Sequence, residues 1–234
     1  MNRIDYIRHE EKKYHDFCYE QYKLFEAGSW LYKPVKTVMN MLNYFEGQKD
    51  LHILDLGSGV GRNSIPIAQK IMNSGGTVTC VDLLDSALTK LQVYSKEHDV
   101  FEYIKTEQSA LEDYYISSNS YNYIIAVSSL EHVRSIEDFK KVLHSMKNGT
   151  KSGGINCLIV NSNIQEIDLE TNQALDALIE INLSTKEMIH TLKDVYTEWQ
   201  EVQVEIKNLT YDIVRNGTHI QLNTNAITFV MQKL

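Results

Sequence analysis

The sequence predicts an α/β fold: a mostly parallel sheet flanked by helices, ending in an antiparallel C-terminal β-hairpin. Along residues 51–160, short apolar strands alternate with longer helical stretches, as in βαβ units. The last two strand-like stretches, 202–214 and 218–231, flank Asn216-Gly217, a strong signal for a hairpin turn. A chain of 234 residues with 43% hydrophobic residues is long enough to bury one sizeable core.

The first 46 residues predict a helical segment that belongs to the same domain as the rest. Residues 3–27 carry aromatic residues at roughly helical spacing, and Gly28-Ser29 ends this helix. Pro34 is tolerated in the first turn of a second helix, which runs to about Phe45. We therefore divide the chain into an N-terminal helical segment, residues 1–46, and a main α/β part, residues 47–234.

In residues 47–234, changes in the spacing of hydrophobic residues predict where strands and helices lie. We expect strands at 51–56, 77–82, 100–105, 121–127 and 155–160. We expect helices at 62–72, 85–96 and 136–146, separated from the strands by glycine-containing or polar turns. Residues 161–185 carry no clear pattern and are expected to form a loop after the fifth strand.

The amino-acid composition argues against several kinds of binding partner. With 23 basic and 31 acidic residues, the formal charge is −8, which argues against binding nucleic acid through its phosphates. Three scattered cysteines predict reduced thiols in a cytoplasmic protein rather than a disulfide framework or a metal site. No apolar run reaches the roughly 20 residues that span a bilayer, so no membrane association is expected.

The most informative stretch runs from the first strand into a glycine-rich turn and then a helix. Gly57, Gly59 and Gly61 stand at alternate positions, where the backbone can turn sharply and approach a ligand. In an open α/β sheet this turn lies at the carboxyl edge, where ligands bind. A tight turn without a ligand remains the alternative.

Asp82 ends the second strand, 25 positions after Gly57. A carboxylate at this place can accept hydrogen bonds from both hydroxyls of a ribose. The alternative is a solvated aspartate that caps the helix of residues 85–96. The two features in this order predict a nucleoside-bearing cofactor.

The neighbouring residues discriminate among such cofactors. A dinucleotide turn needs a small residue where Arg62 stands, and no Gly-Lys-Ser/Thr sequence of a P-loop follows the turn. Asp55 beside the turn would repel a phosphate but suits a cationic amino group. These features disfavour NAD and favour S-adenosylmethionine, which has a ribose, a positive tail and no phosphate.

The same residues resemble a known family. Residues 53–61 and Val81-Asp82 look like the first two motifs of class I S-adenosylmethionine-dependent methyltransferases, which have a Rossmann-like fold, and residues 121–133 resemble the fourth. More narrowly, Gly61-Arg62-Asn63-Ser64 and residues 146–159 resemble the tellurite-resistance methyltransferases. The general resemblance covers about residues 35–234.

The resemblance implies a set of cofactor-binding residues. Asp55, Gly57 and Gly59 would hold the methionine end of the donor, Asp82 its ribose and Leu83 its adenine. The family's aspartate near the adenine is replaced here, so Gln108, Ser109 or Ala110 would take over that contact. The full predicted set is Asp55, Gly57, Ser58, Gly59, Gly61, Asn63, Asp82, Leu83, Ser109, Ala110, Leu111 and Val127.

The expected reaction is in-line transfer of the methyl group to a small-molecule acceptor, with S-adenosylhomocysteine as the product. Alignment of the acceptor does most of the work, and His132 is the candidate general base. A rim histidine without a chemical role is the alternative. Trp30 and Tyr32 are candidate lid or substrate residues, or simply pack the N-terminal helix.

The acceptor itself is not encoded in a readable motif. Tyr211 and His219 are substrate-side candidates beside the hairpin turn, where the tellurite family places cationic residues. This departure weakens the prediction of an oxyanion substrate. A methyltransferase for RNA or protein and a non-catalytic adenosyl-binding module remain alternatives, and the oligomeric state is left open.

Overall fold

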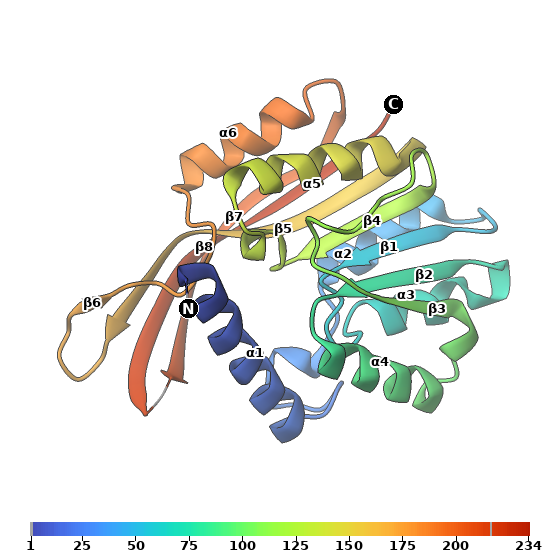
Figure 1. Cartoon of the computed structure of the whole chain (residues 1–234). Helices are drawn as coiled ribbons and strands as arrows, with labels where there is room; N and C mark the ends of the chain where they lie inside the picture. Colours follow the sequence, from blue (N-terminus) through green and yellow to red (C-terminus); the bar gives the residue numbers. More distant parts are fainter. Residues whose placement is uncertain (1, 216) are drawn as a thin grey trace.

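The computed structural model describes residues 2–215 and 217–234 (Figure 1). Its helices are α1 (Arg3–Gln21), α2 (Lys36–Met41), α3 (Ser64–Ile71), α4 (Asp85–Glu97), α5 (Ile136–Gly149) and α6 (Thr185–Val195). Its strands are β1 (His52–Leu56), β2 (Thr77–Asp82), β3 (Ile104–Gln108), β4 (Tyr121–Val127), β5 (Thr150–Asp168), β6 (Ala174–Leu175), β7 (Gln200–Arg215) and β8 (Thr218–Gln232). Short 3₁₀ turns include η1 (Trp30–Tyr32), η2 (Leu42–Phe45) and η5 (Leu130–His132).

The strands form one mixed sheet in the order β3-β2-β1-β4-β5-β8-β7, with β6 paired to β5. The first five strands of this order are parallel, whereas β8 runs antiparallel to both β5 and β7. This arrangement confirms the predicted fold class. The hairpin pairing reaches Arg215 and Thr218, and the predicted turn residue Asn216 lies outside the described residues.

The sheet is covered by hydrophobic cores on both faces. Alternate residues of β1 point to opposite sides, so Ile53 joins one core whereas Leu54 and Leu56 join the other. The first core packs residues of α2, α3 and α4 against the sheet, and the second packs α5 and α6 (Figure 1). The central strands β1 and β4 are therefore buried on both faces, as their continuous apolar runs predict, whereas no residue of the edge strand β3 is fully buried.

The order of strands reverses direction at β1, which has β2 on one side and β4 on the other. A sheet of this kind opens a crevice between the carboxyl ends of these two neighbouring halves. The glycine turn after β1 and the end of β2 both lie there. The fold thus brings the two sequence features that predict a cofactor to one edge.

The N-terminal helix is shorter than predicted. It ends at Gln21 instead of continuing to 27, because Tyr22 adopts an extended backbone and Phe25 has a positive φ of 65°. Among the aromatic residues of this stretch, Tyr19 is buried together with Ile7 and Cys18, whereas the side chains at 6, 14, 17 and 22 are exposed.

Three further expectations were wrong in position or extent. The strand expected at 100–105 begins at Ile104, after a 3₁₀ turn at Phe101–Tyr103. The strand expected at 155–160 runs from Thr150 to Asp168, since β8 provides hydrogen bonds along its polar second half. The expected loop at 161–185 therefore contains the rest of β5 and all of β6.

Helix α6 was not predicted. Its start carries a capping box in which Ser184 and Glu187 exchange hydrogen bonds between side chain and backbone, and Met188, Leu192 and Val195 form its buried face. Both signals are present in the sequence. Across the described part of the chain, no helix is apolar and long enough to cross a bilayer.

Candidate cofactor and acceptor site

The glycine turn is docked onto the end of β2. Gly57, Gly59 and Gly61 have φ values of 75°, 53° and 93°, which other residues rarely adopt. The backbone N–H groups of Gly57 and Ser58 both donate to the carbonyl of Val81, at 2.8 and 3.1 Å. A Cβ added at Gly57 would lie only 2.3 Å from the Cβ of Ser129, so the turn also needs glycine for close packing.

Asp82 links the turn to the start of α4. Its Oδ2 accepts the N–H of Gly59 at 2.8 Å, and its Oδ1 accepts the N–H of Leu84 at 2.9 Å. The second bond is made to the residue before α4, and burial means that Asp82 is not the solvated cap that was the alternative to ribose binding. Burial raises the pKa of Asp82, although these two N–H groups oppose the rise. Each oxygen keeps a lone pair for a further donor.

Two polar groups lie enclosed next to the turn. Asp55 is 1% exposed and its carboxylate accepts a hydrogen bond from the hydroxyl of Ser64. Burial and the nearby charge of Asp82 raise the pKa of Asp55 to about 7, against the effect of the Ser64 bond. The Oγ of Ser58 is buried and, within residues 2–215 and 217–234, has no hydrogen-bond partner.

The segment after β3 comes alongside Asp82. The N–H of Ser109 donates to the carbonyl of Asp82 at 3.0 Å, and the amide of Gln108 donates to the carbonyl of Leu83 at 3.3 Å. The structure thus groups Leu83, Ser109 and Ala110 beside the aspartate. Two more predicted residues, Leu111 and Val127, are partly buried and pack on the two hydrophobic cores.

Asn63 faces the N-terminal segment rather than the turn. Its buried Oδ1 accepts the N–H of Val35 at 2.9 Å, just before α2. Trp30 lies close to the turn, because Arg62 donates to its carbonyl at 2.9 Å and stacks over its ring at 5.3 Å. Tyr32 is exposed, with the amine of Lys33 over its ring at 4.6 Å.

The two hairpin candidates lie on the long antiparallel arm. Tyr211 is 49% exposed on β7, where it pairs with Leu222 of β8. His219 is exposed near the hairpin turn, opposite Val214, and its carbonyl accepts the N–H of Leu169 at 2.9 Å.

His132 ends η5, just past the carboxyl end of β4. Its Nδ1 lies 3.1 Å from Oε2 of Glu180. Burial lowers the pKa of His132, but the charges of Glu11, Glu180 and Glu131 and the bond to Glu180 outweigh it and raise the pKa to about 9. Next to it, Glu131 is buried: Oε1 accepts two bonds from Asn161, whereas Oε2 lacks a partner among the described residues.

One face of α1 carries residues that the sequence analysis missed. Arg8, Glu11, His15 and Tyr19 recur every three or four positions and face the site, so their spacing was the available signal. The Oη of Tyr19 lies 3.2 Å from where a Cβ of Gly59 would stand. Burial raises the pKa of Glu11, but His132 and His15 lower it to about 2.

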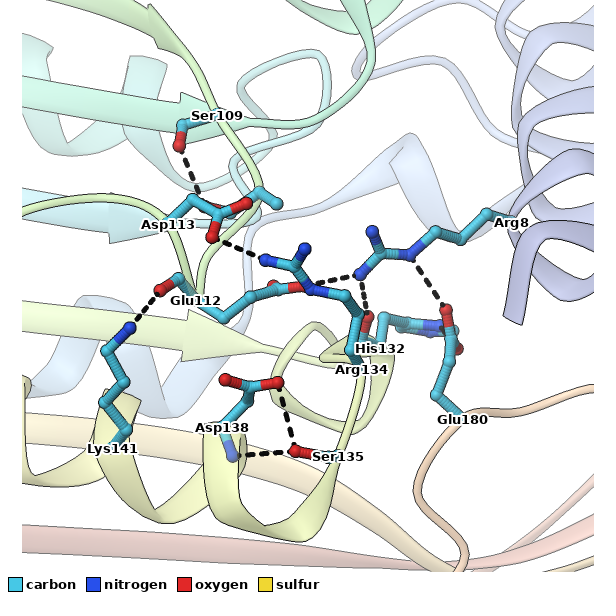
Figure 2. Close-up of polar contacts among 11 residues, drawn as sticks. Arg8, Ser109, Glu112, Asp113, His132, Arg134, Ser135, Asp138, Lys141 and Glu180 are labelled. Carbon is cyan, nitrogen blue, oxygen red and sulfur yellow. Dashed lines mark hydrogen bonds and ion pairs between the residues drawn. The ribbon is translucent and has the colours of Figure 1, made fainter. Parts of the chain in front are cut away.

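Arginine–carboxylate pairs join α1 to the region around η5 (Figure 2). Arg8 binds Oε1 of Glu112 at 2.7 Å and donates to the carbonyl of His132 at 3.3 Å. Arg134 binds the same oxygen of Glu112 at 2.7 Å. Because Glu112 is only 3% exposed, its charge is compensated by these two guanidinium groups.

Comparisons with known proteins agree with this geometry. Residues 53–154 match a family model described as a methyltransferase domain. The ubiquinone biosynthesis O-methyltransferase of Rickettsia akari (strain Hartford) is 27% identical over 172 residues, 71% of this chain and 64% of that protein. The chain thus matches less than two thirds of this relative's length.

Solved structures show the same fold. TehB from Haemophilus influenzae superposes with a TM-score of 0.64 at 15% identity, covering 94% of this chain and 67% of TehB. Geranyl diphosphate C-methyltransferase from Streptomyces coelicolor A3(2), solved with Mg²⁺, geranyl diphosphate and S-adenosylhomocysteine, has a TM-score of 0.58 at 12% identity, covering 85% and 78%. The family match spans the glycine turn, Asp82 and η5, so residues 53–154 resemble a methyltransferase domain, and the solved structures show that the chain has the fold of such proteins.

Proposed function

We propose that the protein is an enzyme that transfers the methyl group of S-adenosylmethionine to a small-molecule acceptor. The observation that carries the proposal is the docked glycine turn with Asp82 beside it, at the carboxyl ends of β1 and β2. The matched methyltransferase domain, residues 53–154, contains both features.

The residues at this edge fit the donor. Asp82 has lone pairs free for ribose hydroxyls, and the unpartnered Oγ of Ser58 is available to a ligand in the turn. In this proposal Leu83, Ser109 and Ala110 surround the adenine. When bound, the donor supplies a methyl group activated by its sulfonium. The contact predicted between Asp55 and the donor's amino group stays a prediction.

In this proposal the acceptor binds between α1, η5 and the hairpin. These elements hold the acceptor in line with the methyl group, and such positioning contributes about 7–11 kcal/mol of a barrier. Where the acceptor must lose a proton, ring nitrogen Nε2 of His132 takes it. Since the pKa of His132 is raised to about 9, the rate of such a reaction should rise with pH as the imidazolium deprotonates.

The proposal specifies a small-molecule acceptor without naming a single compound. The net charge of −8 favours a small molecule over RNA. Cationic residues are missing where the tellurite-resistance family has them, so tellurite is one acceptor to test rather than the proposed one. A cytoplasmic location is supported by three buried free cysteines: Cys18, Cys80 and Cys157.

Methyl transfer from labelled S-adenosylmethionine tests the proposal. The purified protein is incubated with panels of phenols, carboxylic acids, amines, thiols and oxyanions, and separately with RNA and protein. We expect label in a small molecule and a loss of at least 100-fold in Asp82→Ala, with Asp194→Ala, an exposed aspartate of α6, unaffected. Label in RNA or protein alone, or none on any acceptor despite donor binding, would contradict it.

A further inference from the structure

Glu180 stands between His132 and α1. It lies in the segment between β6 and α6, and its side chain is 1% exposed. Its Oε2 is 3.1 Å from Nδ1 of His132, whereas its Oε1 is 3.5 Å from Nε of Arg8 (Figure 2). One buried carboxylate therefore contacts an imidazole on one side and a guanidinium on the other.

The contact with Nδ1 decides which ring nitrogen is free. A carboxylate beside one nitrogen of a histidine keeps the proton on that nitrogen and fixes the orientation of the ring. With Nδ1–H donating to Glu180, Nε2 is the nitrogen that can take a proton from an acceptor. That proton then leaves to solvent, and Nδ1 keeps its own.

Arg8 fixes Glu180 from the opposite side. Its guanidinium also binds Glu112 at 2.7 Å and the carbonyl of His132 at 3.3 Å, so it connects the backbone of η5 to the carboxylate. Residues 8, 112, 132 and 180 come from four separate parts of the chain. Only the docking of α1 brings Arg8 to the other three.

We propose that Glu180 is a positioning residue that holds His132 with Nε2 toward the acceptor, and that Arg8 holds Glu180 in place when α1 is docked. The inference rests on the proposed function, in which His132 is the base. It adds a residue from a segment that lies outside the matched domain, residues 53–154.

The charges that face His132 come from three elements. Glu11 lies on α1, Glu131 precedes His132 in η5, and Glu180 comes from the segment before α6. Arg8 is the cation of α1 that contacts this group, at the His132 carbonyl and at Glu180. The three acids raise the pKa of His132 to about 9 against burial, and Glu180 is the one of them that hydrogen-bonds to the ring.

NMR of ¹⁵N-histidine-labelled protein tests the proposal without an acceptor. The His132 signal is assigned by its loss in His132→Gln. At high pH, the wild type should show the proton on Nδ1, and Glu180→Gln should lower the apparent pKa of His132 by at least one unit. A proton on Nε2 in the wild type overturns the proposal, whether or not the variant folds.

Matched controls separate a charge effect from a general disturbance. Asp194→Asn removes the same kind of partner from His190, an exposed pair on α6 at 3.3 Å, and should leave the His132 signals unmoved. S-adenosylhomocysteine affinity should change less than twofold in Glu180→Gln, because the donor side is separate. An unshifted His132 pKa in a folded Glu180→Gln variant contradicts the proposal.

Kinetics with an identified acceptor separates this inference from the proposed function. Glu180→Gln should move the acidic limb of the kcat profile to lower pH and reduce the plateau kcat by about tenfold. His132→Gln should remove the limb. If His132→Gln keeps the wild-type profile, the base assignment fails; if only Glu180→Gln keeps it, the positioning role fails.

Discussion

Asp55 is a carboxyl group held in the interior beside a second carboxylate. Burial and Asp82 raise its pKa to about 7, well above the value of about 3.9 in an unfolded chain. Between these two values the folded state binds more protons than the unfolded state. The free energy of unfolding therefore falls with rising pH across that window.

Replacing Asp55 by Asn should stabilise the protein. The amide cannot ionise, so the variant avoids the cost of a buried charge. Its free energy of unfolding relative to the wild type should increase from about pH 4 to pH 7, by on the order of 2–4 kcal/mol. Urea unfolding of both proteins from pH 4 to pH 8 measures it. A difference that does not change with pH would contradict the raised pKa.

Gly57 combines a positive φ with a position where a side chain has no room. In Gly57→Ala the new Cβ would meet the Cβ of Ser129 at 2.3 Å, in addition to the strain of a φ of 75°. Gly47→Ala is the matched control, since φ is 79° there but nothing lies within 4 Å. We expect a loss of about 1–2 kcal/mol for Gly47→Ala and at least ~2 kcal/mol more for Gly57→Ala. Equal losses in urea unfolding would show that packing against Ser129 is unimportant.

The residues of the glycine turn and Asp82 were predictable because their pattern is local. Backbone conformation and strand ends fix their positions within a single βαβ unit. Arg8, Tyr19 and Glu180 were not predictable in the same way, because their roles come from contacts between distant segments. Arg8 and Glu112, for example, are 104 positions apart.

Helix α1 is the element that connects both halves of the site. Toward its N-terminus Arg8 reaches Glu112 and Glu180, and farther along Asp16 bonds to Ser86 of α4. Tyr19, one turn beyond Asp16, lies close to Gly59 of the glycine turn. The helix therefore covers the proposed donor site and faces the proposed acceptor side.

Arg8→Ala should loosen α1, because it leaves the buried side chains of Glu112 and Glu180 short of a cation. We expect amide hydrogen exchange in α1 to rise at least tenfold while the strands β1 and β4 stay protected. Lys13→Ala, which removes an exposed cation of the same helix, should leave exchange of neighbouring turns unchanged. Equal exchange in both variants would rule out Arg8 as the attachment.

Some strands and helices were predictable from local sequence patterns, whereas others depend on contacts with distant segments. The central parallel strands β1 and β4 were predictable from apolar runs, since both of their faces are buried. The second half of β5 was not, because residues 161–168 are mostly polar and depend on pairing with β8. Helix α6 was predictable in principle, from its capping box and from Met188, Leu192 and Val195.

At the scale of the whole molecule, the strand order places every part of the proposed chemistry at one edge. The glycine turn follows β1, Asp82 ends β2, and His132 lies shortly after β4. Helix α1 lies along this edge (Figure 1). The alternation of strands and helices predicted this α/β architecture correctly. It left the acceptor unidentified, since the N-terminal helix, the segment 176–183 and the hairpin assemble that side through tertiary contacts.

Calorimetric titration with S-adenosylmethionine, S-adenosylhomocysteine and NAD tests the central claim most directly. We expect the two adenosyl ligands to bind the wild type with micromolar affinity, NAD not to bind, and Asp82→Ala to lose the adenosyl ligands while Asp194→Ala keeps them. Absence of adenosyl binding in the folded wild type, or binding that survives in Asp82→Ala, would contradict the assignment of the glycine turn and Asp82 as the donor site.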